Sequence, residues 1–176
     1  MCGIIGISSN KSVSANIINS LKKLEYRGYD SAGVATLFDG QLNEVKSEGR
    51  VDNLEQNFDL KSLKGNIGIG HVRWATHGIP NSINAHPHSS DNVSVVHNGI
   101  IENSTILKKH LINKGHAFKS QTDTEVIVHL ITENLKIMEL EEAITKTLKQ
   151  LHGSFALGII FKDIPDLIVG ARRGSP

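Results

Sequence analysis

The chain has 176 residues, with 19 lysines and arginines against 18 aspartates and glutamates, so it has the length of one domain and almost no net charge. That balance argues against a nucleic-acid groove or a membrane-binding face. The single cysteine excludes an internal disulfide, no basic region precedes the first apolar run, and no run approaches the roughly 18 apolar residues of a membrane span. We therefore expect a cytoplasmic protein with small-molecule partners.

Hydrophobic periodicity and turn residues predict the elements in chain order. They are a strand over 1–7, a helix over 12–26, strands over 33–38 and 41–47, a short helix over 51–58, a strand over 67–76, a long loop over 77–92, a strand over 93–97, helices over 104–114, 123–137 and 140–151, and strands over 154–161 and 167–171. Strands come in runs and helices in adjacent pairs. This pattern indicates an α+β fold with antiparallel sheets.

Three local signals support these boundaries. Asp39-Gly40 is a strong hairpin signal between two predicted strands. Gly115 stands where a glycine commonly ends a helix, and Thr122 and Glu125 have the spacing of a capping box at the start of the next helix.

The only cysteine is Cys2. Loss of Met1 would place a thiol and an α-amine on one residue, and an amine with a pKa of about 7.7–8.0 is a suitable base for a thiol of about 8.5. Cys2 is therefore a candidate nucleophile that supplies its own base. The alternative is a small buried hydrophobic residue at a frayed chain end.

Further polar candidates lie at strand ends and in loops, where a rigid scaffold presents a site. Arg73 offers a planar fork for a carboxylate, although an ordinary ion pair would explain it equally well. The Asn98 amide and the Gly99 N–H suit an oxyanion hole, and the alternative is a hairpin turn. For Asp123, a favourable interaction with the helix dipole at a helix start would be a sufficient explanation.

Histidines are concentrated between residues 71 and 97. They are His71, His77, His86, His88 and His97. A zinc site would need these side chains to converge, because the only cysteine is distant in sequence. Isolated histidines are more often structural, and we expect no metal.

Six segments, each weak alone, together form a specific pattern. They are Cys2–Gly6, Arg27–Gly33, His71–Gly78, Asn84–His88, His97–Asn103 and Thr122–Glu125. Their order resembles that of class II glutamine amidotransferases, which are N-terminal-nucleophile hydrolases. Within this family the chain is most similar to the glutaminase domain of the glutamine-fructose-6-phosphate aminotransferase (glucosamine-6-phosphate synthase) branch. The resemblance implies a four-layer αββα sandwich.

The resemblance also implies roles for individual residues in the hydrolysis of L-glutamine to glutamate and ammonia. Cys2 would form a γ-glutamyl thioester with its α-amine as the base, and Asn98 and Gly99 would form the oxyanion hole. Arg73 would bind the α-carboxylate of glutamine, and Asp123 would bind its α-ammonium group. The remaining site residues would be Trp74, Thr76 and His77 in a closing loop, with Arg27 and His86 in support. No metal or organic cofactor is implied.

The resemblance extends to the larger enzyme. We expect residues 1–176 to be an incomplete glutaminase domain that lacks the further strands and the sugar isomerase domains of its relatives. We expect the full-length parent enzyme to be a homodimer. Ammonia would then serve conversion of fructose 6-phosphate to glucosamine 6-phosphate. Two alternatives stay open: a catalytically silent glutamine-binding fragment, and the glutaminase domain of an amidophosphoribosyltransferase.

Overall fold

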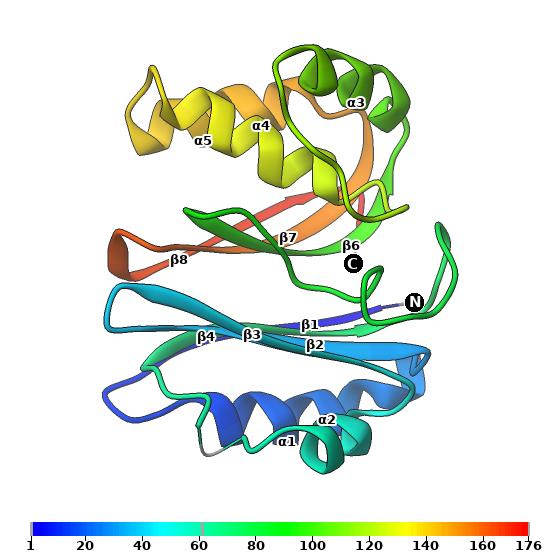
Figure 1. The fold of residues 1–176 in the computed structure, drawn as a ribbon, viewed down its shortest axis with the longest axis vertical. Coiled ribbons are helices and arrows are strands. Elements are labelled where there is room, and N and C mark those ends of the chain that lie inside the picture. Colours follow the sequence, from blue (N-terminus) through cyan, green and yellow to red (C-terminus); the bar gives the residue numbers. More distant parts are fainter. Residues whose placement is uncertain (1, 61, 176) are drawn as a thin grey trace.

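Two antiparallel sheets lie face to face between two layers of helices (Figure 1). This computed structural model describes residues 2–60 and 62–175. In chain order the elements are β1 (Gly3–Ser8), α1 (Ser14–Leu24), a 3₁₀ turn (Glu25–Arg27), β2 (Ser31–Phe38), β3 (Gln41–Glu48), α2 (Val51–Asn57), β4 (Ile67–Arg73), β5 (His88–Ser89), β6 (Val93–Ile101), α3 (Ser104–Asn113), α4 (Glu125–Leu135), α5 (Leu140–Gln150), β7 (Gly153–Phe161) and β8 (Ile164–Arg173). The predicted αββα sandwich is confirmed.

The first sheet has the strand order β1-β4-β2-β3 and the second β5-β6-β7-β8. Every residue of β4 is buried, because α1 covers one face of its sheet and the second sheet covers the other. The backbone of β4 and helix α1 lie very close together, because a Cβ atom at Gly70 would lie only 2.5 Å from Cγ2 of Ile17 on α1. Glycine on β4 therefore lets helix and sheet pack at van der Waals distance.

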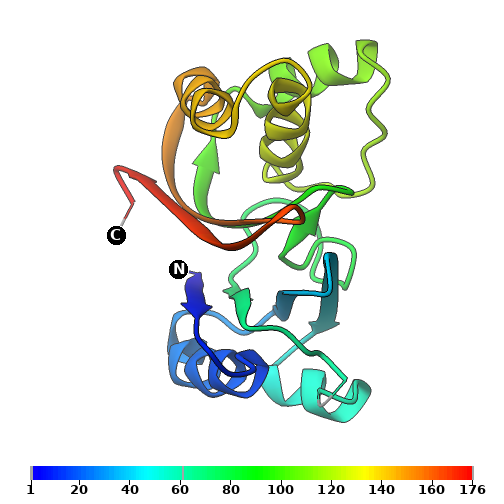
Figure 2. The same cartoon turned by 90° about the vertical axis from the view of Figure 1, so that its left-hand side faces the viewer.

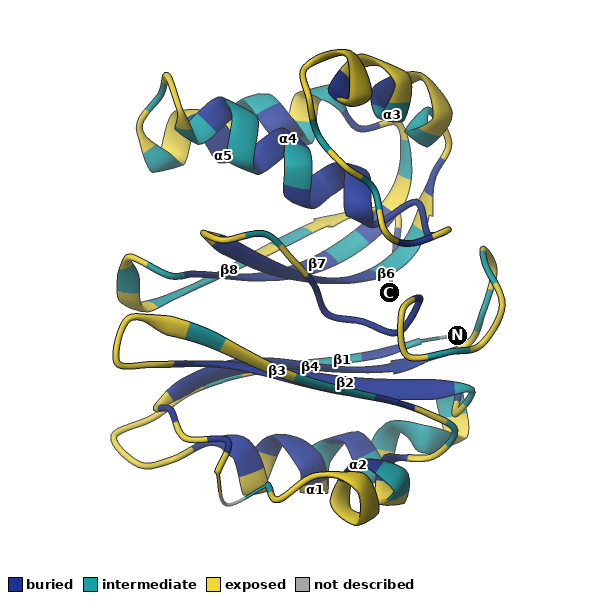
Figure 3. Cartoon of the chain, in the orientation of Figure 1, coloured by how far each residue is buried: buried dark blue, intermediate teal, exposed yellow. Residues whose placement is uncertain are grey.

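Three apolar clusters fill the three interfaces between the four layers. The largest joins α3, α4 and α5 to the outer face of the second sheet, and another joins α1 and α2 to the outer face of the first. The smallest lies between the sheets, where Ile69, Val96 and Ile160 meet. Figure 3 shows buried ribbon on these facing sides and exposed ribbon on the outer sides of the helices. Truncation of a fully buried side chain such as Leu21 to alanine is expected to cost about 2–5 kcal/mol.

The end of β6 differs from the prediction. The strand does not stop at Asn98-Gly99 but continues to Ile101, because the backbone stays paired with β7, with Asn98 opposite Ala156 and Gly99 opposite Phe155. The hairpin alternative for Asn98-Gly99 is therefore wrong. Gly99 has a φ of 141°, and a side chain there would collide with the Ser154 carbonyl.

The start of α4 also differs. The helix begins at Glu125, and no side chain caps it at Thr124. The Glu125 carboxylate instead accepts the backbone N–H groups of Lys119 (2.8 Å) and Ser120 (2.7 Å). The capping-box prediction is thus wrong in its partners, since Glu125 holds the segment before the helix rather than the first turn.

Two smaller differences concern the second sheet. The two-residue strand β5 lies within the predicted long loop, and β8 begins earlier than expected, at Ile164. Figure 2 shows that the start of β1 and the end of β8 both lie at the level where the two sheets meet. Within residues 2–60 and 62–175, no helix has the length and apolarity needed to cross a membrane.

Candidate active site

Cys2 is held beside the end of β4 by the pairing of the first sheet. Gly3 lies opposite Val72, so Cys2, just before β1, lies beside Arg73 at the end of β4. The backbone N–H of Trp74 donates to Cys2 Sγ at 3.3 Å. Burial raises the pKa of the Cys2 thiol above its ordinary value, while the Trp74 bond and the Arg73 charge oppose that rise. The thiol is therefore protonated at neutral pH and needs a base before it can attack.

Two small cavities meet at Cys2. One, of about 20 Å³, is lined by Cys2, Arg73, Trp74, Thr76, His77, His86, His97, Gly99, Thr122, Asp123 and Thr124. The other, of about 130 Å³, is lined by Cys2, Gly3, Ile4, Leu24, Arg27, Asn98 and Ala156. Every site residue named from the sequence thus lines one of the two cavities. Arg73 and Asp123 line the first cavity, whereas Asn98 and Arg27 line the second.

Strand geometry explains this division. Successive side chains of a strand point to opposite faces, so His97 points toward α4 while Asn98 points into the space between the sheets. Because β6 runs past Cys2, its backbone at Gly99 borders the first cavity and its Asn98 side chain borders the second. A substrate carbonyl at the thiol would therefore have candidate donors on two sides.

Arg73 holds the loop that follows it. Its guanidinium donates to the carbonyl oxygens of His77, Gly78 (3.3 Å) and Ile79 (3.5 Å), and Asp30 is 4.0 Å away. The adjacent cavity of about 20 Å³ has room for about one water molecule and not for an amino acid. With residues 74–79 in this position, an amino acid could reach Cys2 through this cavity only after the loop moves.

The Asn84 side chain makes a second set of contacts with the same loop. The Asn84 amide donates to the carbonyl of Ile79 at 3.0 Å, and the Asn84 side-chain oxygen accepts the Gln121 N–H at 2.8 Å. Loop residues 79–84 are thereby tied to the segment that precedes α4. Asn84 is therefore a direct hydrogen-bonded link between the loop and that segment.

Asp123 lies on the segment just before α4 and is buried. Its Oδ2 accepts the backbone N–H of Ile101 at 2.7 Å, and its Oδ1 lies 4.0 Å from Nδ1 of His97. The carboxylate therefore has one oxygen engaged with β6. The other can face a cationic group in the cavity.

The histidines form a buried cluster around this site. The rings of His71 and His86 stack with centroids 4.2 Å apart, and Nε2 of His71 donates to the carbonyl of His97 at 2.9 Å. Burial lowers the pKa of His71 and His88 to about 3 and that of His97 to about 4, and it lowers the pKa of His86 well below its ordinary value. All four are neutral at pH 7. Among the residues described, no three histidine, cysteine or acidic side chains are arranged to hold a metal ion.

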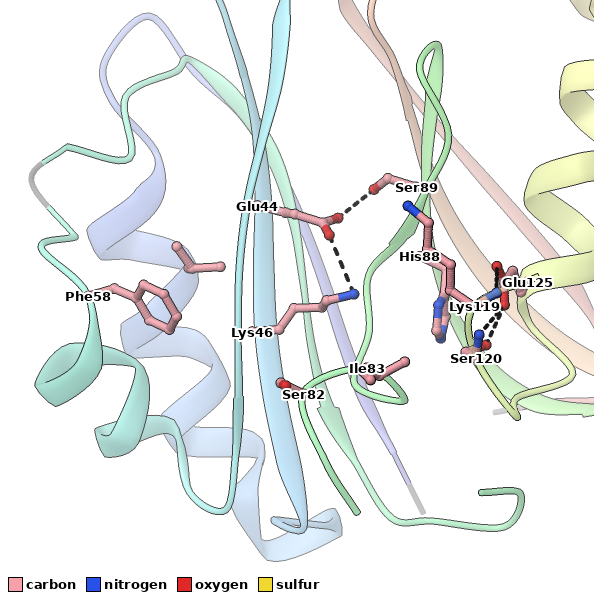
Figure 4. A pocket seen from close by; sticks show the side chains of 11 residues that line it. Glu44, Lys46, Phe58, Ser82, Ile83, His88, Ser89, Lys119, Ser120 and Glu125 are labelled. Atoms are coloured by element: carbon pink, nitrogen blue, oxygen red, sulfur yellow. Dashed lines mark hydrogen bonds and ion pairs between the residues drawn. The ribbon is translucent and has the colours of Figure 1, made fainter. Parts of the chain in front are cut away.

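Another cavity, of about 540 Å³, lies between β3 and the segment that precedes α4 (Figure 4). Glu44 and Lys46 of β3 form one wall of it, and His88, Ser120 and Glu125 belong to the opposite wall (Figure 4). The segment from Lys119 to Glu125 therefore separates this cavity from the smaller one at Cys2.

The hydrogen bonds of that wall have a fixed direction. Burial raises the pKa of Glu125, but contacts with His129, the Lys119 N–H and Ser120 outweigh it and lower the pKa to about 2. The ionised carboxylate can only accept, so the Ser120 hydroxyl donates to it at 2.7 Å. Ser120 then accepts from Thr122 at 3.0 Å, and Thr122 accepts from Nε2 of His88 at 3.0 Å. The chain of donors runs from His88 to Glu125.

Sequence reasoning gave no site role to Asp30, Thr122 or Thr124, and it considered His97 only as a possible metal ligand. Asp30 accepts the Ala75 N–H and the Ser31 hydroxyl, and the other three line the small cavity at Cys2. The available signal was their position inside the recognisable segments, next to residues with an evident charge or amide. Their partners come from distant parts of the chain, and only the fold brings them together.

Comparison with known proteins identifies the family. A family model described as a glutamine amidotransferase domain matches residues 71–173. The chain is 55% identical over 177 residues to glutamine–fructose-6-phosphate aminotransferase [isomerizing] of Mesorhizobium japonicum and 52% identical over 179 residues to that of Pyrococcus horikoshii. The matches cover 100% of this chain but 29% and 30% of these relatives. The chain thus spans less than a third of their length.

Solved structures agree with this result. The glutamine phosphoribosylpyrophosphate amidotransferase from B. subtilis superimposes with a TM-score of 0.80 at 32% identity, over 92% of this chain and 35% of that chain. A glutamine aminotransferase class-II domain protein from Silicibacter pomeroyi, at 17% identity and a TM-score of 0.59, shares the fold over 84% of this chain and 70% of its own. Since the family model covers more than half of the sequence, this chain belongs to the glutamine amidotransferase domain family.

Proposed function

We propose that this domain hydrolyses L-glutamine to glutamate and ammonia through a thioester on Cys2. The observation that carries the proposal is the convergence of Cys2, Arg73 and Asp123 on one small cavity. Glutamine at neutral pH has one α-carboxylate and one α-ammonium group. A guanidinium and a carboxylate beside a thiol therefore match both ends of its amino-acid moiety and leave the side-chain amide for the thiol.

The reaction begins with proton transfer. After removal of Met1, the free α-amine of Cys2 takes the thiol proton, which the raised pKa of the buried thiol makes necessary. Sulfur attacks the amide carbon, and the Asn98 amide and Gly99 N–H stabilise the negative oxygen. The C–N bond breaks, the nitrogen leaves as ammonia with the proton held by the α-amine, and the γ-glutamyl thioester remains. Water then attacks the thioester and releases glutamate.

The loop after β4 closes the site in this proposal. Arg73 exchanges the carbonyls of His77 and Gly78 for the substrate carboxylate, and Trp74, Thr76 and His77 cover the bound glutamine. Exclusion of water strengthens the charge interactions and limits side reactions. His86 supports the cavity at Asp123, and Arg27 supports Cys2 from the second cavity.

We further propose that residues 1–176 form one glutaminase domain and that its ammonia serves the conversion of fructose 6-phosphate to glucosamine 6-phosphate. Sugar isomerase domains, a homodimeric parent enzyme and a cytoplasmic location belong to this proposal. The names of the aminotransferase relatives and their identity of 55% and 52% support it. An amidophosphoribosyltransferase role has weaker support, because that structural neighbour is 32% identical.

The test is a direct assay of the purified protein with L-glutamine. Equal amounts of glutamate and ammonia are expected, with no turnover of D-glutamine and none by Cys2→Ser. Isothermal titration on the same samples separates binding from hydrolysis. Glutamine binding without product from the wild-type chain would overturn the proposed reaction and favour the silent binding fragment. Product formation by Cys2→Ser would exclude the thioester.

A further inference from the structure

Thr124 connects two histidines at the buried side of the candidate site. Its Oγ1 lies 2.7 Å from Nε2 of His86 and 2.9 Å from Nδ1 of His97, and the residue is fully buried. Both imidazoles are neutral at pH 7. A hydroxyl has one proton to donate and lone pairs to accept with, so it can donate to one ring and accept from the other. Valine would fill the same space but could do neither.

The same short segment is tied to β6 at two places. Thr124 bonds His97, and the neighbouring Asp123 bonds the N–H of Ile101. These two positions on β6 bracket Asn98 and Gly99. At about 3.3 Å per residue, they span roughly 13 Å of strand. The two bonds therefore fix both the position of the segment along β6 and its distance from the strand.

We propose that Thr124 is a positioning residue that sets the spacing between Asp123 and the Asn98–Gly99 backbone. In the proposed reaction this is the spacing between the group that binds the substrate's ammonium and the group that stabilises its oxyanion. The inference rests on the proposed glutaminase function. Thr124 acts through Asp123 and His97 and does not itself react.

The surrounding contacts explain why one hydroxyl matters. His86 stacks on His71, and His71 donates to the carbonyl of His97. Together with the two bonds of Thr124, these contacts form a closed set that joins β4, the loop before β5, β6 and the start of α4. Removal of the hydroxyl breaks this closed set of contacts at both bonds of Thr124. It leaves two buried imidazole nitrogens without their partner, which is costly in an apolar interior.

The test compares Thr124→Val with two controls. Thr124→Ser keeps the hydroxyl. Thr132→Val removes a similarly bonded hydroxyl of α4, which contacts the Val128 carbonyl (2.8 Å) and Ser90 (2.9 Å) away from Cys2. For Thr124→Val we expect kcat/KM for glutamine to fall on the order of 100-fold, with a raised KM, because small misplacements at a reacting centre have effects of that size. Thr124→Ser and Thr132→Val should stay within about 3-fold of wild type, since the positioning hydroxyl remains in both.

A second readout separates positioning from general damage. The glutamine-site electrophile 6-diazo-5-oxo-norleucine carries the amino-acid groups, whereas iodoacetamide does not. Thr124→Val should slow labelling of Cys2 by the first reagent and leave labelling by the second unchanged. If Thr124→Val does not fold, Thr124→Cys provides a weaker hydrogen-bonding group of similar size, and an intermediate loss is expected.

Three results would overturn the inference. One is a folded Thr124→Val protein with wild-type kcat/KM and labelling rates. Another is an equal loss in Thr124→Ser, which would assign the effect to packing, and the third is an equal loss in Thr132→Val. Failure of the proposed function is distinguishable, because in that case the wild-type chain itself would not hydrolyse glutamine.

Discussion

The N–H of Trp74 donates to Sγ of Cys2 at 3.3 Å, across 72 residues of sequence. The bond joins the candidate nucleophile to the first residue of the loop that Arg73 holds closed. It also favours the thiolate, against the effect of burial. Movement of this loop therefore changes substrate access and thiol reactivity together.

The shape of the Arg73 side chain should matter as well as its charge. Arg73→Lys keeps the charge but loses the planar fork, so we expect KM for glutamine to rise roughly 10- to 100-fold with a smaller change in kcat. Steady-state assays measure both constants. Arg172→Lys on the exposed part of β8 is the matched control and should be neutral. Unchanged KM in Arg73→Lys would contradict the carboxylate-binding role.

The charge of Asp123 should be needed for substrate binding. Asp123→Asn keeps an oxygen for the Ile101 N–H but loses the negative charge. Hydrogen bonds to charged groups contribute about 1.5–3 kcal/mol, so kcat/KM is expected to fall roughly 10- to 150-fold. The exposed Asp163→Asn serves as the control. The role is excluded if a folded Asp123→Asn enzyme retains wild-type kcat/KM.

The buried histidines should make the fold sensitive to mild acid. Their pKa values in the folded chain, about 3 for His71 and His88 and about 4 for His97, lie below the ordinary 6.5 of the unfolded chain. Their stabilisation is therefore fully present above pH 6.5 and is lost as pH falls toward 4. Each contributes up to about 1.4 kcal/mol per pH unit in this window. Urea unfolding at several pH values tests this, and a free energy of unfolding that is constant from pH 7 to 5 would contradict it.

The Glu125 carboxylate should stabilise the segment before α4 at neutral pH. Glu125→Gln replaces an acceptor of three donors with an amide, and we expect a loss of about 1.5–3 kcal/mol in the free energy of unfolding. Because the folded pKa is lowered from 4.5 to about 2, this difference from wild type should shrink as pH falls through that range. Glu142→Gln, on the exposed first turn of α5, is the control. An equal effect of both substitutions would refute the assignment.

Gly33 should tolerate no side chain. A Cβ atom there would collide with the carbonyl oxygen of His86, whereas a Cβ at Gly170 on β8 meets nothing within 4 Å. Overpacking typically costs about 1–3 kcal/mol, and here it would also displace His86. Gly33→Ala is expected to lower both thermal stability and glutamine turnover, while Gly170→Ala changes neither. Equal melting temperatures for the two variants would count against this packing.

The sequence was informative where one residue has a distinctive chemistry. Cys2 carries the only thiol, whereas the roles expected of Arg73 and Asp123 came from the family resemblance. The periodicity of β1, β4 and α4 predicted the elements that hold all three. Runs of strands and pairs of helices predicted an α+β fold with antiparallel sheets, whereas its four layers were implied by the family resemblance. These features depend on local residue type and spacing.

The contacts that complete the site depend on distant partners and could not be predicted. The capping-box spacing of Thr122 and Glu125 suggested a local bond, but the fold offers Glu125 the donors of Lys119 and Ser120 instead. Likewise, nothing local to Thr124 indicates two imidazoles beside its hydroxyl. The continuation of β6 past Gly99 depends on pairing with β7, which a turn signal in one segment cannot reveal.

The most direct test of the central claim is the intact mass of the purified protein before and after 6-diazo-5-oxo-norleucine. The account predicts a mass without Met1 and one covalent adduct, mapped to Cys2 and prevented by excess L-glutamine. A chain that keeps Met1, or one that lacks Met1 and forms no adduct at Cys2, would contradict the self-activated nucleophile.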